Sequence, residues 1–428
     1  MGTALPTRAA SKVETPPATY SRYQKLDAFA RALSIVEQYY VRPVDDGRLI
    51  HSAIAGMVSE LDPHTSFLPP REAKLLREDI EGAFGGIGMV VVLGRKPDGS
   101  RFLDVRDVIP GGPAEAAGVE VGHRVVRVEG QPIADFGDLE EAIVEIRGKP
   151  GTKISLTLED PDRGILRTLK LTRAIIDPPA VELSYLGEGL GHLRLRDFPE
   201  HATREMKEGL ASLAKQAGDE GLRGVIIDLR DNGGGLLGEA IGIVDLFVDS
   251  GIIVRTRGRQ GKVIDEARAG RPGTERDLPL VLLINKGSAS ASEIVAGALQ
   301  DHGRAVIIGE RSYGKGSVQA PFELDDGSLL KITIALYYTP DDRLIQASGI
   351  TPDVYVGAVA DPKAAMPNLD SRPELPAERE NPGHLEPEDF GRESPPRVDE
   401  SVAVKAAGDD LQLRTAVQHL RVLAKVGG

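Results

Sequence analysis

Two adjoining segments decide the fold: LPLVLLI at residues 278–284 and NKGSASASE at residues 285–293. The first carries no charge, which is typical of a buried strand covered on both faces in an α/β sheet. From Ser290 onward apolar residues recur at helical spacing, so Ser290 is predicted to lie at the start of a helix. Backbone N–H groups there have no partner within the helix and can hold a developing oxyanion. The pattern therefore predicts an α/β fold with a catalytic serine between strand and helix.

A serine hydroxyl needs a base to become a good nucleophile, and the candidate is Lys315. Residues 305–308 read as a second strand beside the first, and the glycine loop that follows carries the lysine to the same edge of the sheet. Lysine acts as a base only when neutral, so its pKa must fall below about 10.4 through burial or a polar cage. Gly314 and Gly316 leave room for such close packing.

These residues also fit other interpretations. The serines of this segment could be helix caps, and a loop lysine is usually solvated. Residues 309–315 also begin like a phosphate-binding P-loop. Gly316 however stands where that loop needs its magnesium-binding Ser or Thr, and the residues after it alternate like a strand. We therefore do not favour nucleotide binding.

Composition narrows the class of protein. A net charge of −13 argues against a nucleic-acid partner. The chain has no cysteine, which excludes disulfides, thiolate metal sites and a cysteine nucleophile. No run of about 18 apolar residues is present, so no membrane-spanning segment is expected. The first eleven residues lack a basic segment followed by an apolar one, so no signal peptide is visible in the chain as given.

The block at residues 287–293, together with Gly314-Lys315-Gly316 and Gln319, resembles the signature of the carboxyl-terminal processing peptidases, or tail-specific proteases. The resemblance implies a Ser-Lys dyad with Ser290 as nucleophile, Lys315 as general base and Gln319 orienting the lysine. It also implies a crotonase-like peptidase core that needs neither metal nor cofactor. Residues 61–65 resemble another stretch common in the family, although His64 itself is interpreted as a structural turn residue.

The segment DLRDNGGG at residues 228–235 follows a predicted strand. A glycine run in that position lets backbone N–H groups turn toward a ligand, but it can also be an ordinary tight turn. Its likeness to the oxyanion loop of the family implies that the N–H groups of Gly234 and Ala291 form the oxyanion hole.

Between about residues 84 and 173 short strands alternate with glycine turns in an order that resembles a PDZ domain. Such a domain pairs a free C-terminus with a sheet edge and holds its carboxylate in a nest of N–H groups. The matching nest is Gly86, Ile87 and Gly88, although a Gly-x-Gly turn alone is usually only a hairpin. His123 stands where the family commonly has Asp, and its effect on pH response or peptide choice is left open.

The expected architecture is α/β, a crotonase-like peptidase core with an inserted PDZ domain and flanking helical segments. The predicted parts are a disordered leader (1–19), a helical region (20–82), the PDZ domain (83–174), the peptidase core (175–358), a flexible linker (359–404) and a C-terminal helix (405–428). The last helix has an apolar stripe that needs a partner, either the core or a second subunit.

The predicted function is a serine endopeptidase that recognises protein C-termini through the PDZ domain and cleaves near the tail. Its expected partners are protein substrates, further copies of the chain through the terminal helices, and an activating adaptor. The resemblance alone places it outside the cytoplasm, in the periplasm. Two alternatives remain: a PDZ scaffold with an inactive core, and a crotonase-like enzyme acting on acyl thioesters.

Overall fold

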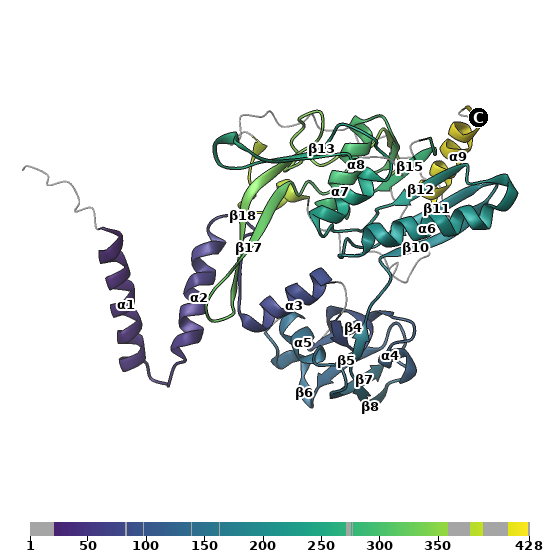
Figure 1. The fold of residues 1–428 in the computed structure, drawn as a ribbon. Coiled ribbons are helices and arrows are strands. Elements are labelled where there is room, and N and C mark those ends of the chain that lie inside the picture. Colours follow the sequence, from purple (N-terminus) through teal and green to yellow (C-terminus); the bar gives the residue numbers. More distant parts are fainter. Residues whose placement is uncertain are drawn as a thin grey trace, which may run out of the picture. The chain divides into compact units, whose positions relative to one another are not determined.

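The computed structural model describes residues 21–81, 84–96, 98–137, 139–161, 163–270, 275, 277–357, 377–387 and 410–426. The chain divides into two compact units, Met1–Met57 and Val58–Gly428. The first contains α1 (Arg22–Tyr39) and most of α2 (Asp46–Ser59), drawn in purple in Figure 1. Ser21 begins α1 with a capping box, because its backbone and side chain both bond to Gln24. The predicted leader, 1–19, lies outside the described residues.

The second unit begins with β1 (Ser66–Leu68) and α3 (Pro70–Glu81) and continues into the predicted PDZ domain. There, strands lie in the order β3-β4-β5-β7-β8, with β6 paired to β5. Their bounds are β3 Met89–Arg95, β4 Arg101–Val108, β5 Arg124–Val128, β6 Gln131–Pro132, β7 Lys153–Asp160 and β8 Ile165–Thr172, with helical segments α4 (Pro113–Ala116), η1 (Ile133–Asp135) and α5 (Leu139–Ile146). β2 (Phe84–Gly86) pairs with β9 (Ala174–Ile176), which joins the start of the domain to its end. β3 is an edge strand and pairs only with β4 among the described strands.

The predicted peptidase core is built on a sheet in the order β10-β11-β12-β15-β16-β19. Its strands are β10 Val181–Gly187, β11 Leu190–Leu195, β12 Gly224–Asp228, β15 Leu280–Ile284, β16 Val306–Gly309 and β19 Val354–Tyr355, and all but β10 run parallel. The uncharged run of the sequence is β15, and every residue of it is buried. The carboxyl ends of parallel strands share one edge of a sheet, which is where ligands bind in such folds.

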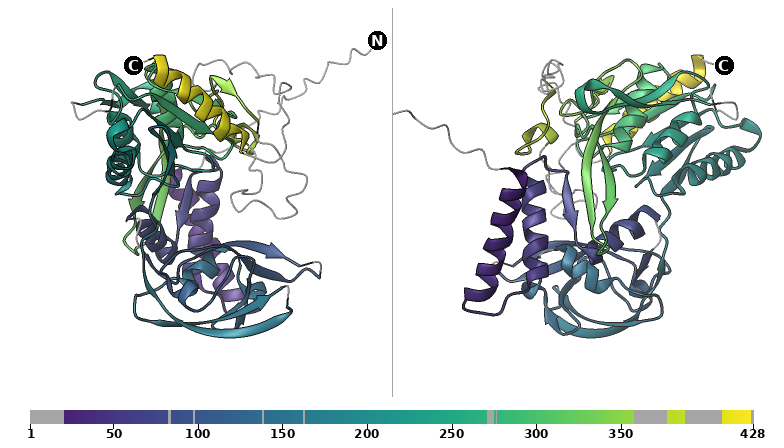
Figure 2. Two further views of the ribbon diagram at one scale, coloured as in Figure 1. Left: turned by 90° about the vertical axis from the view of Figure 1, so that its right-hand side faces the viewer. Right: turned by 60° about the vertical axis from the view of Figure 1, so that its left-hand side comes forward.

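Helices cover both faces of this sheet. The core formed with α6 (Ala202–Ala217), α7 (Leu237–Asp245) and α8 (Ala291–Asp301) is separate from the cluster formed with α9 (Leu411–Val426). Figure 2 shows α9 in yellow on the other side of the sheet from α6 in teal. The stripe on α9 buries Ala416 and Leu420 fully against the sheet of the same chain, which is one of the two partners that the sequence left open.

A second sheet is organised around β18 (Leu329–Tyr338), which pairs with β1, β17 (Ser317–Glu323) and β13 (Ile252–Arg257). β13 pairs in turn with β14 (Val263–Arg268). Short 3-10 turns η2 (Gly218–Glu220) and η3 (Arg259–Gly261) lie in connections. Because β1 joins β18, the turn before β1 comes next to the strands that follow the lysine loop.

A further 3-10 turn, η4 (Glu378–Glu380), lies within the predicted linker. Most of the range 359–404 is outside the described residues, but residues 377–387 are folded and bury Glu378 completely. The sequence composition did not predict this turn.

Replacing Leu420 by Ala is expected to destabilise the protein, because the side chain is fully buried and covers Gly224 of β12. The free energy of unfolding should fall by about 2–5 kcal/mol. Val422→Ala on the same helix is the control, since Val422 is 61% exposed and should change it by less than about 0.5 kcal/mol. Thermal and chemical denaturation measure both, and equal effects would contradict this packing.

Candidate active site

Ser290 occupies the turn between the end of β15 and the first residue of α8. Its φ is +53°, a conformation that costs energy for any residue with a side chain and that is often found at functional sites. The residue is only partly buried, so its hydroxyl remains accessible. The strand and helix therefore present this serine in a strained, partly buried turn.

The carboxylate of Glu293 joins this turn to the lysine loop. One of its oxygens accepts the backbone N–H groups of Ser290 (2.8 Å) and Lys315 (2.9 Å). The other accepts the Ser312 hydroxyl (2.5 Å) and the Gly314 N–H (2.7 Å). Burial raises the pKa of Glu293 to about 7, although the four hydrogen bonds favour the charged form. A single buried carboxylate thus holds the predicted nucleophile and base together by their backbones.

The Lys315 side chain is largely desolvated. Burial lowers the pKa of its amine, and the neighbouring Lys331 lowers it further, while Glu378, Glu293 and Asp62 oppose the shift. This is the direction that a lysine base requires. In the part of the chain that the structure describes, the Lys315 amine makes no hydrogen bond to the Ser290 hydroxyl.

Close packing of the lysine loop depends on Gly316. A Cβ on this residue would lie 2.2 Å from the backbone N of Gln346, so no larger residue fits. The Gly316 N–H donates to Gln346 Oε1 at 3.0 Å. The glycines beside Lys315 therefore have the role that the sequence suggested.

The structure does not bring the Gln319 amide onto the lysine. Gln319 lies on β17, and its amide donates to the hydroxyls of Ser317 (2.7 Å) and Thr333 (3.4 Å). Within the described residues it makes no hydrogen bond to Lys315. An orienting role for Gln319 stays a prediction.

The two N–H groups predicted for the oxyanion hole lie close together, but one of them already donates a hydrogen bond. A Cβ on Gly234 would be 2.9 Å from the Ala291 nitrogen, so the glycine loop touches the start of α8. The Gly234 N–H donates to Asn232 Oδ1 at 2.9 Å, whereas the Ala291 N–H has no acceptor among the described residues. Only Ala291 is free to receive an oxyanion in this conformation.

In the PDZ domain the predicted carboxylate nest lies at the start of edge strand β3. The carbonyls of Ile87 and Gly88 accept the N–H groups of Ala114 and Ile109, at 2.7 and 3.0 Å. Their own N–H groups donate to nothing in the described part of the chain. Gly86 belongs to β2 and pairs with Ala174. Two unused donors beside an open strand edge are what a bound C-terminus needs.

The two histidines singled out by the sequence have different surroundings. Asp62 accepts the backbone N–H of His64 (2.9 Å), which makes the expected turn, and His64 Nε2 also bonds to Glu378 at 2.8 Å. His123 is buried, and its Nδ1 accepts the Glu120 N–H at 3.0 Å, so it fixes its own turn in the PDZ domain.

Sequence reasoning assigned no role to Glu293, although a signal was present. Ser at a helix start with Glu three residues later is the pattern of a capping box, and a charged residue in an otherwise apolar helix needs a buried partner. Glu378 gave no such signal.

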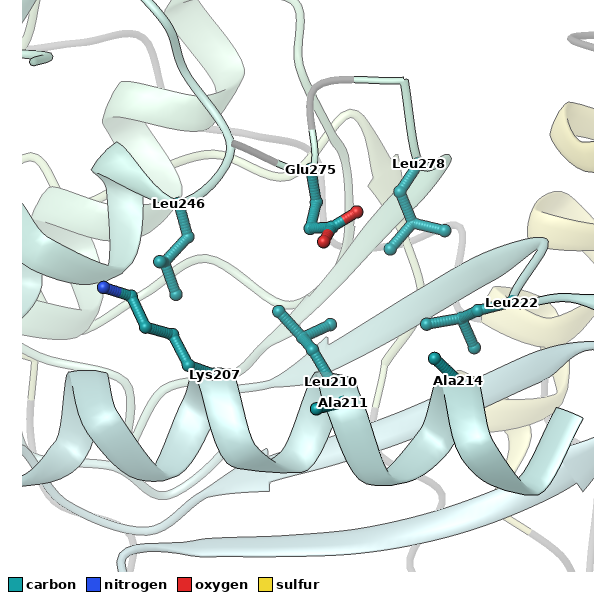
Figure 3. Close-up of a pocket in the computed structure, with 8 residues that line it drawn as sticks. All are labelled: Lys207, Leu210, Ala211, Ala214, Leu222, Leu246, Glu275 and Leu278. Carbon is teal, nitrogen blue, oxygen red and sulfur yellow. The ribbon is translucent and has the colours of Figure 1, made fainter. Parts of the chain in front are cut away.

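A separate cavity of about 220 Å³ lies against α6 (Figure 3). Its lining combines leucine and alanine side chains with Lys207 and Glu275. None of its lining residues is a predicted site residue.

Neither a metal site nor a membrane span is found in the described ranges. These residues contain no cluster of three or more His, Cys, Asp or Glu that could hold a metal ion. They also contain no helix long and apolar enough to cross a membrane.

Comparisons with known proteins agree with this architecture. Residues 189–356 match the model of peptidase family S41, residues 105–160 that of a PDZ domain, and residues 4–70 that of the activating protease CtpB N-terminal domain. The chain is 40% identical to a carboxy-terminal-processing protease of Bartonella bacilliformis over 78% of this chain and 75% of that protein. It is 34% identical to the carboxy-terminal processing protease CtpA of Bacillus subtilis, over 83% and 72%.

Among solved structures, the photosystem II D1 C-terminal processing protease has 31% identity and a TM-score of 0.49, covering 78% of this chain and 93% of that one. The fold, the family models and the sequence relatives together define a serine-type peptidase with a PDZ domain. The chain belongs to the carboxyl-terminal processing proteases of family S41.

Glu293→Gln is expected to loosen the serine turn and the lysine loop, because an amide NH₂ would face backbone donors that need an acceptor. Each buried donor left unpaired costs about 1–3 kcal/mol, so both the melting temperature and the rate of peptide cleavage should fall. Ser312→Ala removes one of the four donors to Glu293 and the acceptor of the Ile350 N–H, but it keeps the contacts of Glu293 with Ser290 and Lys315, so it should lower the cleavage rate less. A Glu293→Gln enzyme with the wild-type kcat would contradict the bridging role.

Proposed function

We propose that this protein is an endopeptidase that binds protein C-termini in its PDZ domain and cleaves near the tail through a Ser290–Lys315 dyad. The observation that carries the proposal is the Glu293 carboxylate, which accepts backbone N–H groups from both residues on one oxygen. It joins the backbones of a strained serine and a desolvated lysine, which supports the proposal because nucleophilic catalysis needs a nucleophile and a base that can reach each other.

The mechanism follows from the chemistry of these groups. The neutral amine of Lys315 takes the proton of the Ser290 hydroxyl, and the alkoxide attacks the peptide carbonyl. The N–H of Ala291 stabilises the resulting oxyanion, joined by that of Gly234 after it leaves Asn232. The leaving amine receives the proton, and water then releases the acyl group. We assign Gln319 to orienting the lysine during this cycle, and no step needs a metal or cofactor.

Substrate recognition is assigned to the PDZ domain. The tail would add to the open edge of β3 as a further strand, with its carboxylate at the N–H groups of Gly86, Ile87 and Gly88. The unused N–H groups of Ile87 and Gly88 support this binding mode.

We further propose a crotonase-type core, an extracytoplasmic location, self-association through terminal helical segments and an activating adaptor. The match of residues 4–70 to an activating-protease N-terminal domain fits an adaptor. The location rests on the likeness to bacterial carboxy-terminal processing proteases.

Ser290→Ala and Lys315→Ala are each expected to reduce peptide cleavage by about 10³-fold or more, because each removes a group that acts in the chemical step. Fluorophosphonate should label the wild type at Ser290 and should not label Ser290→Ala.

The acid limb of the wild-type rate profile should follow Lys315: activity rises as the pH passes upward through the lowered pKa of the amine. A scaffold with an inactive core would instead bind tails without turnover in the wild type.

A peptide with an amidated C-terminus is expected to be a poorer substrate than the same peptide with a free carboxylate, because the amide removes the charge that the N–H nest receives. The loss should be a rise in KM of about tenfold, with kcat little changed. Fluorophosphonate labelling of Ser290 is the control, since it does not use the PDZ domain. Equal KM values for the two peptides would contradict carboxylate recognition.

A further inference from the structure

Residues 377–387 lie after the peptidase core and bury a charged side chain beside the lysine loop. Glu378 has no exposed surface. Its carboxylate accepts hydrogen bonds from Gln346 Nε2 (2.8 Å) and Asn381 Nδ2 (3.3 Å) and pairs with His64 Nε2 (2.8 Å). A buried carboxylate is costly unless it is hydrogen-bonded, so this cluster of partners is needed to keep it there.

The same segment bonds directly to the lysine loop before Lys315 and reaches the loop after Lys315 through Gln346. The Glu378 N–H donates to the Tyr313 carbonyl (3.1 Å), and the Asn381 amide donates to the Tyr313 hydroxyl (2.6 Å). Tyr313 precedes the lysine by two residues. On the other side, Gln346 receives the N–H of Gly316 while it donates to Glu378. The segment is further anchored by Leu385, which packs on the apolar cluster of Leu336, Tyr338 and Leu344.

Glu378 is ionised in this setting. Burial raises the pKa of the carboxyl, but the hydrogen bonds with His64, Gln346 and Asn381, together with the electrostatic effect of His64, hold it below its usual value. Its negative charge then acts on the Lys315 amine from one side.

We propose that Glu378 is a positioning residue for Lys315: it holds the loop directly before the lysine, supports it through Gln346 after the lysine, and supplies a negative charge near the amine. The inference rests on the proposed function, in which Lys315 is the general base. It gives the segment after the core a role in the reaction, since without that segment the loop would lose its bonds at Tyr313, and Gln346 would lose the carboxylate that holds it beside Gly316. Glu378 itself touches no reacting atom.

The charged groups around the amine come from four elements. Lys331 on β18 lowers the pKa of Lys315, whereas Glu378 on η4, Glu293 on α8 and Asp62 in the turn before β1 raise it. His64 faces Glu378 rather than the lysine. Removing the negative charge of Glu378 therefore makes the amine easier to deprotonate.

The test uses Glu378→Gln, Glu378→Ala and, as a matched control, Glu380→Gln on the same turn, where the side chain is exposed. Glu378→Gln removes the charge and keeps the size of the side chain and an acceptor for Gln346. In this variant two quantities are measured against pH: the rate of fluorophosphonate labelling of Ser290 and kcat for peptide cleavage. The acid limb of both profiles should move to lower pH. Glu378→Ala should lower kcat by about tenfold with KM little changed, because Gln346, which accepts the Gly316 N–H, loses the carboxylate that holds it in place. Glu380→Gln should match the wild type in all three measurements.

An acid limb in Glu378→Gln that coincides with that of the wild type would overturn the inference, even if the variant were less stable, because a merely structural role does not move a pH profile. Should Glu378→Ala fail to fold in a thermal melt, the profile of Glu378→Gln decides alone. If fluorophosphonate did not label the wild type, the proposed function would fail, and this inference with it. Labelling of the wild type without a shift in Glu378→Gln would overturn only the inference.

Discussion

The site depends on one buried carboxylate that receives four hydrogen bonds. Glu293 lies in the first turn of α8, and two of its four donors are the backbone N–H groups of Ser290 and Lys315. Removing a carboxylate from water costs several kcal/mol, and each hydrogen bond to a charged acceptor returns about 1.5–3 kcal/mol. The charge is tolerated only while the serine turn and the lysine loop both converge on it, so burial of Glu293 and assembly of the site are one event.

The sheet makes that convergence possible. β12, β15 and β16 run parallel, so the segments that follow them leave from one edge. The glycine loop, the serine turn and the lysine loop are these three segments. Two glycines then allow contact distances that a side chain would prevent: Gly234 against the start of α8, and Gly316 against Gln346.

Particular residues show which parts of the fold and of the site the sequence could predict. The uncharged run at 278–284 predicted β15, and the small residues after it predicted Ser290 at a helix start, because burial and helical periodicity are local patterns. The four-donor contact of Glu293 joins segments about twenty residues apart and leaves no periodic signal. The composition of 359–404 indicated a linker, yet Glu378 is held there by His64, more than 300 residues earlier. Such contacts follow from tertiary packing and cannot be predicted from the spacing of residues along the sequence.

The proposed chemistry requires some hydrogen bonds of the site to be exchanged for others. The Gly234 N–H is bonded to Asn232, the Gln319 amide to Ser317 and Thr333, and the Ser290 hydroxyl has no hydrogen bond to the Lys315 amine. Each such neutral hydrogen bond has a net worth of only about 1 kcal/mol, whereas the Glu293 contacts are charged and buried. The backbones of the serine turn and the lysine loop are therefore held strongly, whereas the groups proposed to react are held weakly. A bound peptide has only to exchange these weak bonds for its own, since catalytic hydrogen bonds commonly form fully only in the substrate complex.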